Sequence, residues 1–128
     1  MDGLIINEPY ANMIINNQKK WELRSRKPPS EKIGTEIGLL SKGHLLGKII
    51  IENSKGPLSI KELKKTKDLH KSDVSFLSPD FSSYAWEIEV AEVFEKPKKY
   101  VHPMGARVWV KDVKLVEDYM KNKITYYI

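Results

Sequence analysis

Cysteine is absent from the 128 residues, and histidine occurs only three times. The chain therefore has no disulfide, no thiolate ligand for zinc or an iron–sulfur cluster, and no cysteine nucleophile. The three histidines, His44, His70 and His102, do not have the spacing of metal ligands. We therefore expect neither a metal site nor a bound cofactor.

Long apolar segments are lacking as well. No run approaches the roughly 18–20 apolar residues that cross a bilayer. The first residues, Met-Asp-Gly-Leu-Ile-Ile-Asn, do not have the basic region and long apolar stretch of a signal peptide. The absence of cysteine also suits a reducing compartment. We expect a cytoplasmic protein that does not bind membranes.

Familiar phosphate and metal motifs are missing too. The sequence contains no G-x-G-x-x-G, no P-loop and no H-E-x-x-H. It also lacks the strand–helix alternation of a doubly wound parallel sheet. Because chains of about 100–150 residues usually bury one core, we predict a single domain over residues 1–128, with 114–128 as a C-terminal extension.

Charge is unevenly distributed along the chain, which carries a formal net charge of +5. Residues 19–32 and residues 55–71 each hold six basic and two acidic side chains, and residues 96–123 hold eight basic and three acidic ones. Residues 80–95 hold only acidic ones. Basic segments of this kind are typical of proteins that bind nucleic acid, because phosphate contacts release counterions. The alternative is that the lysines simply solvate the surface.

The first part of the chain predicts a short strand, a helix and a second strand. Residues 3–6 are apolar, and apolar residues then recur at helical spacing over 8–16, with Asn7 as the N-cap. Asn16-Asn17 is a plausible helix stop, because asparagine adopts the left-handed conformation. Residues 21–26 alternate between apolar and charged side chains, the pattern of a half-buried strand.

The middle of the chain predicts two strands, a helix and an irregular stretch. Residues 36–41 and 45–51 are expected to be strands joined by a turn at 42–44. Ser59 and Glu62 match a capping box, which predicts a basic helix over 60–70. The following residues, up to 83, lack a clear period.

The last part predicts strands at residues 84–93 and 106–113, with a loop at 95–99 between them. Residues 115–128 resemble a short helix with an aromatic tail. Together the elements predict an α+β fold, a small β-barrel of about five to six strands with two or three flanking helices.

Two early motifs resemble the signature of a known family. Glu8-Pro9-Tyr10-Ala11 is similar to the box that opens a helix in the ASCH (activating-signal-cointegrator homology) domain, and Lys19-x-x-Glu22-x-Arg24 is similar to the segment that leads into its next strand. Asn17 stands where the family usually has glycine, and asparagine preserves the turn. The similarity continues to about residue 114, through Gly47-Lys48-Ile49-Ile50, Tyr84-Ala85-Trp86-Glu87-Ile88, Pro97, His102-Pro103-x-Gly105-Ala106 and Trp109.

This resemblance implies a PUA-like barrel with a cleft beside the first helix and the strand that carries Glu22 and Arg24. Members of the family are thought to bind RNA or modified nucleosides, and a few are hydrolases or nucleases. We therefore expect an RNA or nucleoside-like ligand and a monomeric protein. The resemblance and the basic segments together suggest the following nucleic-acid-binding residues: Tyr10, Lys19, Glu22, Arg24, Arg26, Lys64 and Arg107.

The charged residues of the predicted strand 21–26 favour ligand recognition. Glu22, Arg24 and Arg26 project from the same face of such a strand. A carboxylate beside two guanidinium groups can hold a base edge while the cations bind phosphate. The alternative is an ordinary surface ion pair between Glu22 and Arg24, worth about 0–1 kcal/mol.

Lys19 and Glu22 are the candidate catalytic residues, and whether the protein is an enzyme stays open. A lysine near an apolar pocket can have its pKa lowered enough to act as a base. Acetylcytidine amidohydrolases of the same superfamily have threonine at the position of Glu22, so the resemblance implies a phosphate-contacting Lys19 rather than their reaction. No complete catalytic constellation occurs in the sequence.

Three aromatic residues have two interpretations each. Tyr10 and Trp21 can stack on a base or belong to the core, and for Trp21 we favour the core. Arg107, Trp109 and Lys111 would form a basic and aromatic stripe on one strand face, or Trp109 would point inward.

Three functional hypotheses follow. The first is an RNA-binding module with the basic segment 60–71 as a flank. The second is a small hydrolase acting on a modified nucleoside, or a ribonuclease. The third, a protein-interaction domain, rests only on the acidic segment 80–95.

Overall fold

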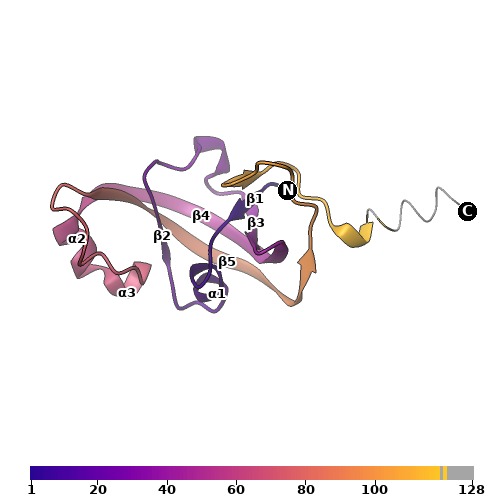
Figure 1. The fold of residues 1–128 in the computed structure, drawn as a ribbon, viewed down its shortest axis with the longest axis horizontal. Coiled ribbons are helices and arrows are strands. Elements are labelled where there is room, and N and C mark those ends of the chain that lie inside the picture. The colour runs from indigo at the N-terminus through magenta and orange to yellow at the C-terminus, as the bar shows by residue number, and fades with distance from the viewer. Residues whose placement is uncertain (119, 121–128) are drawn as a thin grey trace, which may run out of the picture.

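The computed structural model describes residues 1–118 and 120. Within them one mixed sheet of six strands has the order β2-β5-β4-β3-β1-β6 (Figure 1). The strands are β1 (Gly3–Ile5), β2 (Trp21–Arg24), β3 (Glu36–Ser41), β4 (His44–Ser59), β5 (Ser82–Lys99) and β6 (Trp109–Val110).

The long antiparallel pair of β4 and β5 forms the centre of the sheet. It extends from the His44–Lys99 pair to the Ser59–Ser82 pair, and its register shifts at several points along the way. Such bulges bend and twist a strand pair. On one side β5 pairs with β2, and on the other β4 leads through β3 to β1, which pairs in parallel with β3 and antiparallel with β6.

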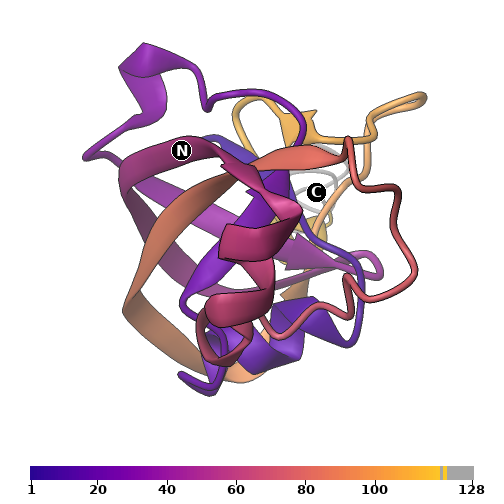
Figure 2. The same cartoon turned by 90° about the vertical axis from the view of Figure 1, so that its left-hand side faces the viewer.

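The structure confirms the α+β class but not the predicted barrel. In the described part of the chain, the hydrogen-bonded order ends at β2 on one side and at β6 on the other, and these strands do not pair with each other. The sheet is nevertheless curled, as the view in Figure 2 shows. Arg24 of β2 donates a hydrogen bond from Nη2 to the carbonyl oxygen of Ile5 in β1, at 3.0 Å. We call the opening between β2 and β1 the seam.

The first helix, α1 (Tyr10–Ile15), is shorter than the predicted 8–16. Asn7 is not its N-cap, because Pro9 precedes the helix and makes no side-chain cap. Instead the Glu8 carboxylate accepts the backbone N–H of Asn12 at 2.8 Å. Asn17 is left-handed, with φ of 61°, which confirms the predicted stop.

The predicted basic helix over 60–70 is divided in two. The capping box of Ser59 and Glu62 is confirmed at the start of α2 (Ile60–Lys65). The chain leaves helical geometry at Thr66 and resumes it in α3 (Lys67–His70). Contacts place α2 on β4 and α3 on β2, at one end of the sheet (Figure 1). A 3-10 turn, η1 (Ser30–Lys32), follows the proline pair at 28–29.

None of the helices in these described residues is long and apolar enough to cross a membrane.

Several predicted strand limits are wrong. β4 continues beyond residue 51 to Ser59, and residues 95–99 are the last part of β5 rather than a loop. They pair with the start of β4, Lys98 with Leu45, and this non-local partner outweighs the loop-like composition. The predicted strand 106–113 is reduced to the two residues of β6. Of the segment 115–128, which we predicted to be a short helix with an aromatic tail, residues 116–118 are helical. The aromatic tail lies outside the described residues.

Two apolar clusters fill the interior of the curled sheet. The smaller joins Leu40 and Leu45 to Tyr100 and Val110. At Gly47 the strands approach so closely that a Cβ atom would collide with the Glu92 carbonyl oxygen. The larger cluster lies between α1 and the sheet and consists of Leu4, Ile6, Ala11, Ile14, Ile15, Ile37, Leu39, Leu46, Ile49, Ile51, Trp86 and Ile88.

Candidate functional site

A cavity of about 300 Å³ lies at the seam, and we call it the seam cavity. β1 and β2 form two of its walls, and α1 and the segment after α3 contribute others. It contains four of the seven predicted binding residues, Tyr10, Glu22, Arg24 and Arg107. Its complete lining consists of Ile5, Asn7, Tyr10, Glu22, Leu23, Arg24, Ser72 and Arg107.

The guanidinium of Arg24 is fixed in the wall of the seam cavity. Its Nε donates to Oε2 of Glu22 at 3.0 Å, and its Nη2 lies 2.9 Å from the same oxygen and 3.0 Å from the carbonyl oxygen of Ile5. Among the described residues, Nη1 has no hydrogen-bond partner. A guanidinium held in this way has lost its freedom before a ligand arrives, while one nitrogen stays available to it.

Glu22 is buried, contrary to the predicted alternation of apolar and charged faces. It is 7% exposed, while its neighbour Trp21 is 9% exposed. The Glu22 carboxylate lies between two cations, because Oε1 is 3.6 Å from Nζ of Lys19 and Oε2 contacts Arg24. The pair is therefore not the exposed surface ion pair of the alternative interpretation.

Lys19 lies beneath the seam cavity and does not line it. Its side chain is 1% exposed, and its Nζ donates to the carbonyl oxygen of His70 and lies 4.7 Å from the ring centre of Tyr10. Burial lowers the pKa of Lys19, Glu22 partly offsets this, and the nearby positive charge of Arg24 lowers the pKa further. The ammonium is therefore engaged by Glu22 and the His70 carbonyl oxygen, and Lys19 is not among the residues that line the seam cavity.

His70 completes this buried network from α3. It is fully buried, with Nε2 at 2.7 Å from the Leu63 carbonyl oxygen and Nδ1 at 3.0 Å from the backbone nitrogen of Ser72. A carbonyl requires a donor and a backbone N–H requires an acceptor, so the ring is neutral with its proton on Nε2. Burial lowers the pKa of His70, the hydrogen bond to the Leu63 carbonyl oxygen partly offsets this, and the charges of Lys19 and Lys67 lower the pKa further.

We expect the domain to lose stability as the pH falls below about 6.5, the ordinary pKa of histidine. At such pH the unfolded chain binds a proton at His70, whereas the folded domain does not, because folding lowers the pKa of His70. The free energy of unfolding should fall by at most about 1.4 kcal/mol per pH unit, until the folded pKa is reached. Urea unfolding at pH 7.5, 6.5 and 5.5 measures this loss.

The matched variants for that pH prediction are His70→Gln and His44→Gln. Because His44 is only half-buried and lies outside the network, its variant should keep the wild-type pH dependence. His70→Gln should lose it. Equal pH dependence in all three proteins would contradict the assignment to His70.

The remaining predicted binding residues lie elsewhere. Arg26 follows β2 and lines a neighbouring cavity. Lys64 is exposed in the last turn of α2 and lines neither cavity.

The two tryptophans with open interpretations both pack inward. Trp21 is buried, as we favoured, and the Trp109 ring stacks on Trp86, with 6.1 Å between the ring centroids. The alternating stripe of Arg107, Trp109 and Lys111 is therefore not formed on one outer face.

The sequence did not identify several residues of the site, some in the cavity lining and one in the buried network beside it. Ser72 lies in the stretch without a period, and no local pattern links it to β2. Asparagine is a common N-cap residue, but Asn7 lines the seam cavity instead of capping α1. His70 gave no signal as a buried partner of Lys19, because their contact joins residues 51 positions apart.

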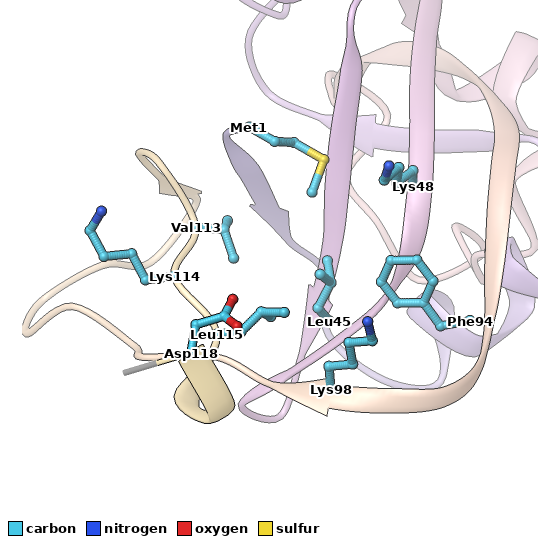
Figure 3. A pocket seen from close by; sticks show the side chains of 9 residues that line it. All are labelled: Met1, Leu45, Lys48, Phe94, Lys98, Val113, Lys114, Leu115 and Asp118. Atoms are coloured by element: carbon cyan, nitrogen blue, oxygen red, sulfur yellow. The ribbon is translucent and has the colours of Figure 1, made fainter. Parts of the chain in front are cut away.

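A different cavity, of about 470 Å³, lies near the smaller apolar cluster (Figure 3). Leu45 and Phe94 line it on the sheet side, and Leu115 faces them from the segment after β6. Two of its lysines already have acidic partners, Lys48 with Glu92 at 3.6 Å and Lys114 with Asp112 at 3.3 Å. It contains none of the predicted binding residues, so we do not include it in the candidate site.

Over residues 1–118 and 120, no group of three or more histidine, aspartate or glutamate side chains is arranged to hold a metal ion.

The fold and the seam cavity define a small α+β domain with a cavity, lined by two arginines and a glutamate, at the open side of a curled sheet. The ASCH domain family matches residues 4–98, most of the chain, and the protein belongs to this family.

Among solved structures, a mutant of the protein ZmASCH from Zymomonas mobilis is similar in fold. The two chains are 12% identical, the TM-score is 0.54, and the match covers 98% of this chain and 94% of that one. At this identity the similarity concerns the fold alone. A comparison with curated proteins found no match.

Proposed function

We propose that this ASCH domain binds RNA, or a modified nucleoside within it, in the seam cavity. The observation that carries the proposal is the Arg24 guanidinium, clamped by Glu22 and the Ile5 carbonyl oxygen in the cavity wall with Nη1 unengaged among the described residues. Membership of a family generally linked to RNA binding supports it.

The size and lining of the cavity suit a nucleotide. About 300 Å³ is at the small end of the range for ligand sites. Tyr10 offers an aromatic surface, and stacking of a base on such a ring is worth about 1–3 kcal/mol. Arg24 and Arg107 offer planar cations to phosphate, and the Asn7 amide and Ser72 hydroxyl offer donors and acceptors to a base edge.

A basic flank extends from this cavity. α3 packs against β2, and Ser72 of the cavity lining lies two residues after the end of this helix at His70. The ion pairs found among the described residues do not include any lysine of the α2–α3 segment, so these charges can attract a phosphate backbone. They are Lys61, Lys64, Lys65, Lys67 and Lys71.

The hydrolase hypothesis has one observation in its favour, the lowered pKa of Lys19, which a lysine acting as a base needs. It also requires the Lys19 nitrogen to reach the ligand. That nitrogen is buried against His70 and Glu22, and Lys19 is not among the residues of the cavity lining.

The proposal predicts steeply salt-dependent binding. Fluorescence anisotropy with a labelled single-stranded RNA and a labelled hairpin, at several salt concentrations, measures it. Three to five phosphate contacts should give a slope of about −2 to −3.5 in a plot of log affinity against log salt. No binding at low salt, or an affinity that does not depend on salt, would contradict the proposal.

A further inference from the structure

A second cavity, of about 440 Å³, adjoins the seam cavity, and we call it the tryptophan cavity. The two cavities share one residue, Arg24, which lines both. The tryptophan cavity is lined by Arg24, Ser25, Arg26, Lys27, Pro29, Trp86, Val108 and Trp109. The shared guanidinium therefore lies between two ligand-sized spaces.

The floor of the tryptophan cavity is aromatic and rigid. Trp86 is 3% exposed and donates its Nε1–H to the Arg26 carbonyl oxygen at 2.9 Å. The Trp109 ring stacks on it with an interplanar angle of 19°. Val108, which is 39% exposed, and Pro29 extend the apolar surface. Trp86 itself is covered, so the apolar surface open to a ligand comes from Trp109, Val108 and Pro29. The Lys32 ammonium lies 5.6 Å from the Trp109 ring centre. A partly aromatic apolar surface of this kind suits a nucleobase.

The rim of the tryptophan cavity is cationic. Arg26 and Lys27 are both exposed, and neither forms an ion pair in the described part of the chain. The guanidinium of Arg24 lies 5.7 Å from the Trp86 ring centre, so its plane and charge border the aromatic floor. An aromatic floor with unpaired cations at its rim matches a base with its phosphate.

We propose that the tryptophan cavity is a second nucleotide subsite and that Arg24 binds the phosphodiester between the two nucleotides. This inference rests on the proposed function. The ligand class is then single-stranded RNA of at least two nucleotides, rather than a free nucleoside. A strand can place two unstacked bases in neighbouring cavities, whereas the bases of a duplex stay stacked on each other. Hydrogen bonds to Glu22 and to the Ile5 carbonyl oxygen hold Arg24 in place, and Arg24 is the residue that lines both cavities.

The experiment compares three ligands by calorimetric titration at low salt: the ribonucleotides pN, pNp and pNpN, made with each of the four bases. The compound pNp adds a phosphate without a second nucleoside, so the step from pNp to pNpN reports the contribution of the second nucleoside, whose base is the part that can stack. In the base series that binds best, pNpN should bind at least about fivefold more tightly than pNp, the smallest gain expected from one stacked base.

A carboxylate placed in the tryptophan cavity tests the location. Val108→Asp should abolish the gain of pNpN over pNp, because Val108 lines the second cavity and not the first. Val101→Asp is the matched control, since Val101 is similarly exposed, at 44%, and lines neither cavity. It should keep the full gain.

The outcomes separate this inference from the proposed function. If pN binds and pNpN binds no more tightly than pNp, the second subsite is wrong and the seam cavity stands. If the gain is present and survives Val108→Asp, the second base lies elsewhere and the subsite is again wrong. If none of these ligands and no longer RNA binds at low salt, both proposals fail.

Discussion

The variant Glu22→Ala should be destabilised by about 3 kcal/mol, the largest effect on stability that we expect from a single substitution at the site. Breaking a buried ion pair by removing one partner typically costs about 3–5 kcal/mol, because the other charge stays buried without compensation. Here the orphaned charge is the ammonium of Lys19, whose side chain is 1% exposed. The lower end of the range applies because the Arg24 side chain, at 23% exposure, keeps part of its hydration.

Urea unfolding of three proteins tests this value. Glu22→Gln keeps the size and an acceptor oxygen but removes the charge, and it should be destabilised less than Glu22→Ala. The double variant Lys19→Met/Glu22→Ala removes the cation together with its partner, and it should recover at least about 1 kcal/mol. A loss below about 1 kcal/mol for Glu22→Ala would match a surface ion pair and would overturn the buried network.

Substitution of Arg24 should have the largest effect on binding. We expect Arg24→Gln to weaken binding of single-stranded RNA by about 100-fold, or about 3 kcal/mol, which lies within the range for truncating a hydrogen-bonded charge. The substitution removes the fixed cation and leaves the Glu22 carboxylate facing a negatively charged ligand. Fluorescence anisotropy at low salt gives the affinities.

Arg24→Lys and Lys114→Gln are the informative comparisons for this loss. A lysine keeps the charge but cannot reproduce the planar bonds to Glu22 and Ile5, so it should lose about tenfold. Lys114 is exposed and lies outside both cavities, so its variant should bind like the wild type. If Arg24→Gln and Lys114→Gln bind equally well, the seam cavity is not the binding site. Circular dichroism of each variant verifies that it is folded.

Local signals in the sequence were sufficient for some elements and not for others. The capping box at Ser59 and the left-handed Asn17 were predictable, because each depends on residues within one turn. The continuation of β5 through residues 95–99 was not, because its partner lies in β4, some fifty positions earlier. Residues 95–99 are rich in lysine and contain a proline, as loops often do, and only the pairing with β4 makes this segment a strand.

The site shows the same division. The spacing of Glu22 and Arg24 placed both on β2, and both line the seam cavity. The period-two pattern predicted that Glu22 and Arg24 share the charged face of the strand, but it gave no sign that Glu22 is buried there with Lys19 and Arg24 compensating its charge. Alternation identifies which residues share a face, but it cannot show that another part of the chain covers that face. Here the cover comes from α1 and from the residues that follow α3.

The family match ends at residue 98, whereas the proposed binding surface extends further along the chain. Arg107 of the seam cavity and Val108 and Trp109 of the tryptophan cavity come from the segment beyond it, which β6 attaches to β1 through the Trp109–Leu4 pair. A chain shortened to the matched residues would keep the Glu22–Arg24 clamp but would lose one wall from each cavity. The smallest unit that keeps both cavities complete therefore extends at least through Val110, twelve residues past the end of the family match.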